Sequence, residues 1–99
     1  MNRKPVHDSR DRQDMAQRLR WVRHYVGLGQ RELGEELGVG VQAVSNWEKG
    51  RSRIGIKPVY QLLIRFQISS DFIIAGITSG LDQNKLKDWL EFKKKDIIS

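Results

Sequence analysis

The stretch QRELGEELGVGVQAVSNWEKG, residues 30–50, limits the fold more than any other part of the chain. It holds two short amphipathic segments joined by a few residues, with glycine at the joint and again at the end. Leu33 and Leu37 in the first segment, and Val44 and Trp47 in the second, are spaced to share one helix face. Two helices of about eight residues joined by a tight glycine-containing turn predict a helix-turn-helix.

The outer face of the second of these helices is polar but uncharged. It carries Gln42, Ser45 and Asn46. An amide side chain can donate and accept along the N6/N7 edge of adenine at the same time. In a helix-turn-helix the second helix enters the major groove and the first crosses the DNA backbone. The face therefore favours reading of base edges, although two helices around a glycine turn also occur in many helical bundles, so periodicity alone leaves the function open.

The overall charge favours a polyanionic partner. The 99 residues include 18 Lys and Arg against 12 Asp and Glu, for a formal net charge of +6. DNA, RNA or an anionic membrane surface all fit such a balance. The absence of cysteine excludes disulfides and thiolate zinc sites. Because no apolar run approaches the ~20 residues of a membrane span and no secretory signal opens the chain, we expect one soluble cytoplasmic domain.

Apolar residues at helical spacing predict one helix before this pair. It spans about 12–26, with Asp11 or Asp14 as its cap and Gly27 as its stop. The residues expected to face inward are Met15, Leu19, Val22 and Val26. Residues 1–10 are almost without apolar content, and we interpret them as a flexible basic arm that is either disordered or touches DNA phosphates.

Three more helices are predicted after the pair. The fourth covers 58–66 with Pro58 in its first turn, and its inward residues are Leu62, Leu63 and Phe66. The fifth lies in ISSDFIIAG, with Ser69 or Ser70 as cap and Gly76 as stop. The sixth covers about 81–94, where Ser79 and Asp82 have the spacing of a capping box. Its apolar stripe consists of Leu86, Trp89, Leu90 and Phe92. Three alternatives are open for this helix: it packs on the body of the chain, it pairs with another subunit, or it is mobile.

From about Leu19 to Gly76 the chain resembles the Cro/phage-repressor-type helix-turn-helix family, also called lambda-repressor-like or Xre-type. The family pattern of GLSQxxLAxxLGVS followed by a recognition helix ending in WExG stands here as VGLGQRELGEELGVGVQAVSNWEKG. IRFQISSDFIIAG is similar to the closing LxVSxDxLxxG. The resemblance implies an all-α, compact five-helix bundle over residues 11–76. Residues 77–99 would add a C-terminal amphipathic helix as a possible dimerisation or partner element.

The chain departs from the family pattern at four positions. Gly29 and Gly40 stand where Ser or Thr usually caps the second and third helices. Gly34 replaces a common alanine, at a cost of up to about 1 kcal/mol in helix propensity. Val41 stands where relatives often carry a polar base-reading residue, and it can contact a thymine methyl group instead.

The resemblance also implies roles for individual residues. The base-reading residues would be Val41, Gln42, Ser45 and Asn46. The phosphate-binding residues would be Gln30 at the start of the second helix, Lys49, Arg51 and Arg53, with Arg31 and Arg18 as weaker candidates. For Lys49, Arg51 and Arg53, the alternative is a basic loop that is exposed to solvent and contacts no phosphate. Arg23 and Glu48 would form a structural ion pair, and Trp47 is expected in the core.

The implied function is a sequence-specific regulator of transcription that binds double-stranded DNA. It would be a dimeric repressor of phage, prophage or bacterial type, reading a palindromic operator through the major groove. The dimer surface would be the fifth helix, with Phe72, Ile73 and Ile74, or the C-terminal helix. The alternatives are an antitoxin that binds a toxin and represses its own operon, or a protein-interaction module on the same fold.

We expect that this chain is not an enzyme and that it has no cofactor site and no metal site. His7 and His24 have no partner at metal-ligand spacing and are interpreted as surface residues. No credible Ser/His/Asp or Cys/His set and no phosphate-binding glycine loop is present. The carboxylates of the second helix are expected to form a solubilising face.

Overall fold

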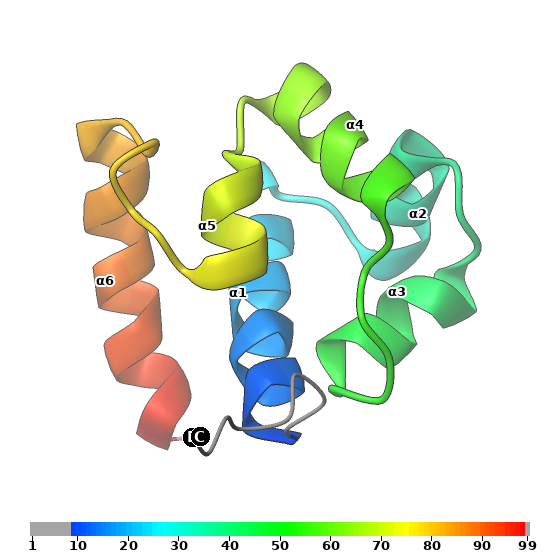
Figure 1. Cartoon of the computed structure of the whole chain (residues 1–99), viewed down its shortest axis with the longest axis horizontal. Coiled ribbons are helices and arrows are strands. Elements are labelled where there is room, and N and C mark those ends of the chain that lie inside the picture. Colours follow the sequence, from blue (N-terminus) through cyan, green and yellow to red (C-terminus); the bar gives the residue numbers. More distant parts are fainter. Residues whose placement is uncertain (1–8, 99) are drawn as a thin grey trace, which may run out of the picture.

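The computed structural model describes residues 9–98, and this part of the chain consists of helices without a strand (Figure 1). The helices are α1 (Ser9–Val26), α2 (Gln30–Leu37), α3 (Val41–Glu48), α4 (Ile56–Phe66), α5 (Ser70–Ala75) and α6 (Gln83–Ile98). In Figure 1, α1 lies between α6 on the left and the α2–α3 pair on the right. None of the described helices combines the length and the apolar composition that crossing a membrane requires.

Aromatic side chains fill the core between α1, α5 and α6. The Trp21 ring is fully buried, with its centroid 5.3 Å from that of Phe72 and 5.8 Å from that of Trp89. Our prediction for α1 omitted Trp21 and included Val26, which is only half-buried. The prediction was wrong because α1 contacts α3 on one side and α5 and α6 on another, so its buried face is wider than a single stripe.

Several helix ends differ from the predicted ones. α1 begins at Ser9, so Asp11 and Asp14 lie inside the helix and neither caps it. Ser9 and Arg10 therefore belong to α1, while the rest of the predicted arm, with His7, lies outside the described residues. α4 begins at Ile56, which still leaves Pro58 in the first turn, where its missing N–H is not needed.

α6 begins two residues later than predicted and extends past residue 94. Asp82 caps it: the Asp82 carboxylate accepts the backbone N–H of Lys85 at 2.8 Å and the Lys85 ammonium at 2.7 Å. The Lys85 side chain and then the Lys85 backbone N–H lower the pKa of Asp82. Ser79 is not the cap, since α6 starts at Gln83 directly after Asp82.

Of the three alternatives for the C-terminal helix, the structure shows packing on the body of the chain. Trp89 is buried, and its ring meets that of Phe72 edge-on at 5.1 Å. Leu86 and Phe92 pack against the core from the side, whereas Leu90 stays exposed. Most of the apolar stripe of α6 is thus covered within the chain itself.

Two predictions about inward and outward residues fail on α4 and α5. Leu63, expected in the core, is 41% exposed, because Val59 and Leu62 already form the buried face of α4. Phe72 and Ile73, expected at a dimer surface, are fully buried, and only Ile74 of that set is exposed. Exposed apolar side chains line α4 instead, and we call Ile56, Tyr60, Leu63 and Ile64 the α4 stripe.

Candidate nucleic-acid interface

A tight turn fixes the angle between α2 and α3. Gly38 ends α2 with φ at 75°, a left-handed conformation that glycine adopts without strain. The Val39 N–H then donates to the Gly34 carbonyl at 2.8 Å. A Cβ atom on Gly34 would lie 2.7 Å from the Val39 carbonyl oxygen. Gly34 therefore does more than cost helix propensity, because its missing side chain lets the turn approach α2.

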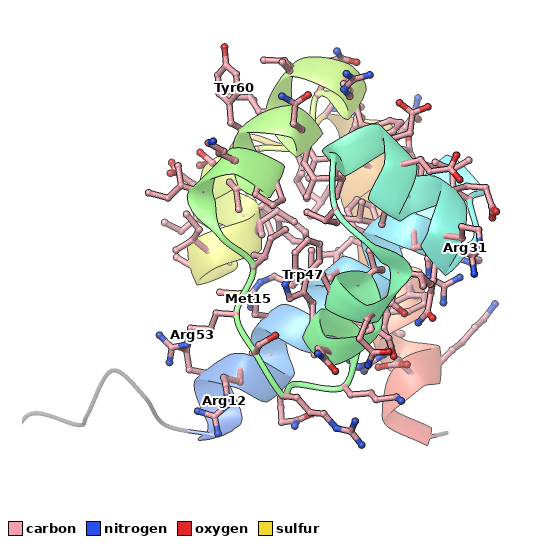
Figure 2. All side chains as sticks on the ribbon, turned by 90° about the vertical axis from the view of Figure 1, so that its right-hand side faces the viewer. Arg12, Met15, Arg31, Trp47, Arg53 and Tyr60 are labelled. Carbon is pink, nitrogen blue, oxygen red and sulfur yellow. The ribbon has the colours of Figure 1, made fainter. Side chains whose placement is uncertain are left out.

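α3 has a buried face and an outward face. Val44, Trp47 and Glu48 are buried, so the expected core position of Trp47 is confirmed. The four predicted base-reading residues fall on the other side, within an arc of about 140° at 100° per residue; they are Val41, Gln42, Ser45 and Asn46. Gln42 is exposed and the other three are half-buried. In Figure 2, Trp47 points from α3 toward the middle of the molecule.

The outward face is made of adaptable hydrogen-bonding groups. The Gln42 side-chain amide donates weakly to the Asn46 amide oxygen at 3.4 Å. This contact lies at the protein surface, and both amides have donors and acceptors left for another partner. The two side chains are thus held side by side, one helix turn apart.

An ion pair between half-buried Arg23 and buried Glu48 anchors the end of α3 to α1. Arg23 donates through Nε to Glu48 Oε2 at 2.7 Å and through Nη2 to Glu48 Oε1 at 3.1 Å. The hydrogen bond with Glu48 raises the pKa of Arg23 against the opposing effect of burial. The Gln30 side-chain amide also donates to Glu48 Oε1, at 3.1 Å. The Gln30 side chain is thus turned toward Glu48 and away from the start of its own helix.

The C-terminal end of α3 is held by further side chains of α1 that the sequence did not reveal. Arg20 Nη1 donates to the Glu48 carbonyl at 2.8 Å, Gln13 Nε2 to the Lys49 carbonyl at 3.3 Å, and Arg12 Nε to the Gly50 carbonyl at 3.2 Å. Carbonyls at a helix end lack partners within the helix, and cations there are stabilised by the helix dipole. The only signal in the sequence was the helical spacing of Arg12, Arg20 and Arg23 on α1.

The predicted phosphate-binding cations fall into two groups. Arg31, Lys49 and Arg51 are exposed. Arg53 is half-buried and forms an ion pair with Asp11 at 2.6 Å, so a phosphate would have to compete with that carboxylate. Figure 2 shows Arg53 and Arg12 together beside the start of α1 and Arg31 on the opposite flank of the α2–α3 pair.

Arg18 is not a surface cation, and its prediction as a weak phosphate contact is wrong. Its guanidinium is buried and donates to the Ile73 and Ile74 carbonyls at 3.0 and 3.3 Å. Burial lowers the pKa of Arg18, more than the nearby Asp14 and Asp11 raise it. Arg18 therefore ties α5 to α1.

Among residues 9–98, no group of three His, Asp or Glu side chains is arranged to hold a metal ion. His24 is exposed, as expected, and its ring lies 5.4 Å from that of Phe92. The exposed polar and cationic side chains around α3 include Gln42, Lys49 and Arg51, and they offer hydrogen-bond donors and positive charge at the surface.

Comparison with known proteins supports this interpretation. A family model described as helix-turn-helix matches residues 19–73, which is more than half of the chain. No curated protein and no solved structure matches the chain. The matched region runs from the middle of α1 through α5 to Ile73 and contains the whole α2–α3 pair, whereas α6 lies beyond it. The chain belongs to the Cro/C1-type, or lambda-repressor-like, helix-turn-helix family, and it is a DNA-binding regulator of transcription.

Proposed function

We propose that the chain represses transcription as a homodimer that reads a palindromic operator with α3 in the major groove. The observation that carries this proposal is the uncharged polar face of α3 on a helix whose other end is fixed to α1. A rigidly held face of hydrogen-bonding groups discriminates between bases, whereas a charged face mainly attracts phosphates. Occupancy of a promoter suffices for repression.

In this proposal each outward residue of α3 has its own contact. Gln42 and Asn46 donate and accept at adenine N6 and N7. Ser45 hydrogen-bonds to either kind of base edge, and Val41 packs on a thymine methyl group. The order of these residues along α3 makes Val41 and Gln42 the deepest readers, because the N-terminal part of a recognition helix contacts the base edges.

The phosphate contacts lie on the two flanks of α3. Lys49 and Arg51 follow the recognition helix directly and are both exposed. On the other flank, Arg31 and the backbone N–H groups of residues 30–32 at the start of α2 face a second phosphate group, with Gln30 held by Glu48. Arg53 joins the first flank when a phosphate displaces Asp11.

Single substitutions of Lys49 and Arg51 test these phosphate contacts. Lys49→Ala and Arg51→Ala should each weaken binding to all duplexes about equally and reduce the slope of log K against log salt by about 1. Fluorescence anisotropy of a labelled duplex, titrated at several salt concentrations, gives the slope. Lys94→Ala removes an exposed lysine from α6 and serves as the control. An unchanged slope in both variants would contradict the proposed contacts.

The homodimer is proposed because one recognition helix reads only a few base pairs. Two-fold dimers place their recognition helices about 34 Å apart, one turn of DNA. The α4 stripe is the surface we propose for the dimer, since its four side chains are 41% to 84% exposed on one helix. Apolar patches of this kind on a monomer usually mark interaction sites.

Charged residues in the α4 stripe should separate the two subunits. We expect the double variant Tyr60→Glu, Leu63→Glu to sediment as a monomer at concentrations where the wild type is a dimer, because two buried carboxylates would oppose association. Its affinity for a palindromic duplex should fall to that for a single half-site. Leu90→Glu changes an exposed leucine of α6 in the same way and should stay dimeric. The reverse pattern, with Leu90→Glu monomeric and the double variant dimeric, would place the dimer surface on α6.

A further inference from the structure

A continuous chain of hydrogen bonds links the C-terminal helix to the recognition helix through α1. Asp96 of α6 accepts from Arg20 Nη2 at 2.7 Å and from Gln17 Nε2 at 3.1 Å. The other terminal nitrogen of Arg20, Nη1, donates to the carbonyl of Glu48, the last residue of α3, at 2.8 Å. Figure 1 shows that α6 and α3 lie on opposite sides of α1, so this series of hydrogen bonds crosses the molecule from one side of α1 to the other.

The chemistry of Arg20 makes this link rigid. A guanidinium is planar, and its nitrogens point in fixed directions. Holding Nη2 on Asp96 therefore also sets where Nη1 meets α3. The Asp96 carboxylate is mostly buried, and the hydrogen bond from Arg20 lowers its pKa more than burial raises it, with a smaller lowering by the hydrogen bond from Gln17. The carboxylate is thus charged and held in place at neutral pH.

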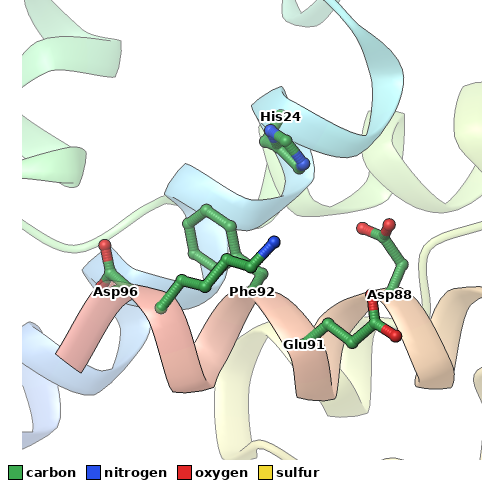
Figure 3. A pocket seen from close by; sticks show the side chains of 6 residues that line it. His24, Asp88, Glu91, Phe92 and Asp96 are labelled. Atoms are coloured by element: carbon green, nitrogen blue, oxygen red, sulfur yellow. The ribbon is translucent and has the colours of Figure 1, made fainter. Parts of the chain in front are cut away.

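The rest of α6 fixes Asp96 to the body. The Trp21 indole N–H donates to Asp88 at 2.8 Å, and Trp89 is buried against Trp21 and Phe72. An open groove of about 370 Å³ lies beside α6. Figure 3 shows three of the residues that line it, Asp88, Phe92 and Asp96, along α6, with His24 on α1 above them. Asp96 is therefore presented to Arg20 by a helix that is anchored at several points.

We propose that Asp96 and Arg20 are positioning residues for DNA recognition, so that the C-terminal helix sets how firmly α3 is held against the operator. This inference rests on the proposed function for its effect on DNA binding. It adds an element outside the region that the family model matches, because that region ends at residue 73. Asn46 lies two residues before the Glu48 carbonyl that Arg20 holds, and Lys49 and Arg51 lie one and three residues after it, so loosening this end displaces base-reading and phosphate-binding residues together.

The sign of the effect of Asp96→Ala distinguishes this role from simple electrostatics. Removing a carboxylate from a DNA-binding protein adds one unit of positive charge, which by itself tightens binding to any duplex. Positioning predicts the opposite: a loss of about threefold to tenfold in affinity for the duplex that the wild type enriches from a random pool, which lies within the range of coupling that mutations along such networks change. Affinity for a random-sequence duplex should stay equal or rise.

Two further variants complete the test. Glu91→Ala makes the same charge change at an exposed carboxylate of α6, and it should not lower affinity for the enriched duplex. Arg20→Lys keeps the charge but replaces the two-pronged donor with a single ammonium group, and it should show the loss seen in Asp96→Ala. If Asp96→Ala binds the enriched duplex as tightly as Glu91→Ala does, the proposal is overturned.

Amide hydrogen exchange tests the link without DNA. The N–H groups of Lys49 and Arg51 donate to the Ser45 and Asn46 carbonyls at 3.1 and 2.9 Å, so they report on the end of α3. Both should exchange faster in Asp96→Ala, while the Gln67 N–H at the end of α4 keeps its rate. Equal acceleration of exchange at Lys49, Arg51 and Gln67 would show a general loss of stability. Unchanged exchange at Lys49 and Arg51 would show that α6 does not hold α3. Either result would overturn the positioning role. If no duplex is enriched but Lys49 and Arg51 still exchange faster, the proposed function fails and the link itself stands.

Discussion

Replacing Glu48 by alanine is expected to lower the free energy of unfolding by about 3 kcal/mol. The Glu48 side chain is 5% exposed and accepts hydrogen bonds from both Arg23 and Gln30. Its removal leaves the Arg23 guanidinium and the Gln30 amide without the carboxylate that accepts from both. The estimate lies at the low end for a buried ion pair, because Arg23 is 31% exposed and can regain water. Chemical denaturation followed by circular dichroism measures the loss.

A double variant distinguishes two contributions to this loss: the destabilisation caused by leaving Arg23 unpaired, and the net stabilisation that the ion pair provides. Arg23→Met combined with Glu48→Leu removes both charges and keeps the volume, so most of the stability should return. Glu48→Gln keeps the shape and an acceptor, and its loss should lie between those of the wild type and Glu48→Ala. A loss under about 1 kcal/mol in Glu48→Ala would mean that the pair behaves like an exposed one and does not anchor α3.

The largest expected effect on function comes from the outward face of α3. The double variant Gln42→Ala, Asn46→Ala should bind the operator about 10²- to 10³-fold more weakly, since each good amide–adenine pair contributes about 1–3 kcal/mol. The two losses should not add fully, because the side chains contact one another at 3.4 Å. Competition binding with the enriched duplex and with a random duplex measures both affinities.

The matched control uses the same residue types on another helix. Gln83 and Asn84 are exposed at the start of α6, and changing both to alanine should leave binding to the enriched duplex unchanged. The Gln42→Ala, Asn46→Ala variant should keep its thermal stability and its affinity for random duplexes, because neither side chain is part of the core. Equal losses for operator and random duplexes would show that these residues grip DNA without reading it.

The α2–α3 pair was the part of the fold that local sequence predicted best. Leu33, Leu37, Val44 and Trp47 are all buried, and α2 and α3 have the predicted starts. Such short helices are set by residues three or four apart and by Gly38, so nearby sequence contains the necessary information. Local sequence does not determine which face of a longer helix is buried, because that depends on the helices that pack against it. For this reason Trp21 on α1 and Leu63 on α4 were assigned to the wrong side.

The candidate site divides in the same way. The outward arc of α3 follows from helical periodicity alone. By contrast, the grip of Arg12, Gln13 and Arg20 on the last carbonyls of α3 joins residues 28 to 38 positions apart and involves backbone acceptors, which have no sequence signature. Arg18 shows the same difficulty, since an arginine that holds the α5 carbonyls looks like any surface cation in the sequence.

Selection of bound duplexes from a random DNA pool at about physiological salt, followed by sequencing, tests whether α3 reads a DNA sequence. We expect a palindromic motif whose half-sites lie about one helical turn apart, with adenines among the specified positions. Duplexes recovered without any shared motif would contradict it, because a polar α3 face held this firmly would then have no base edges to read.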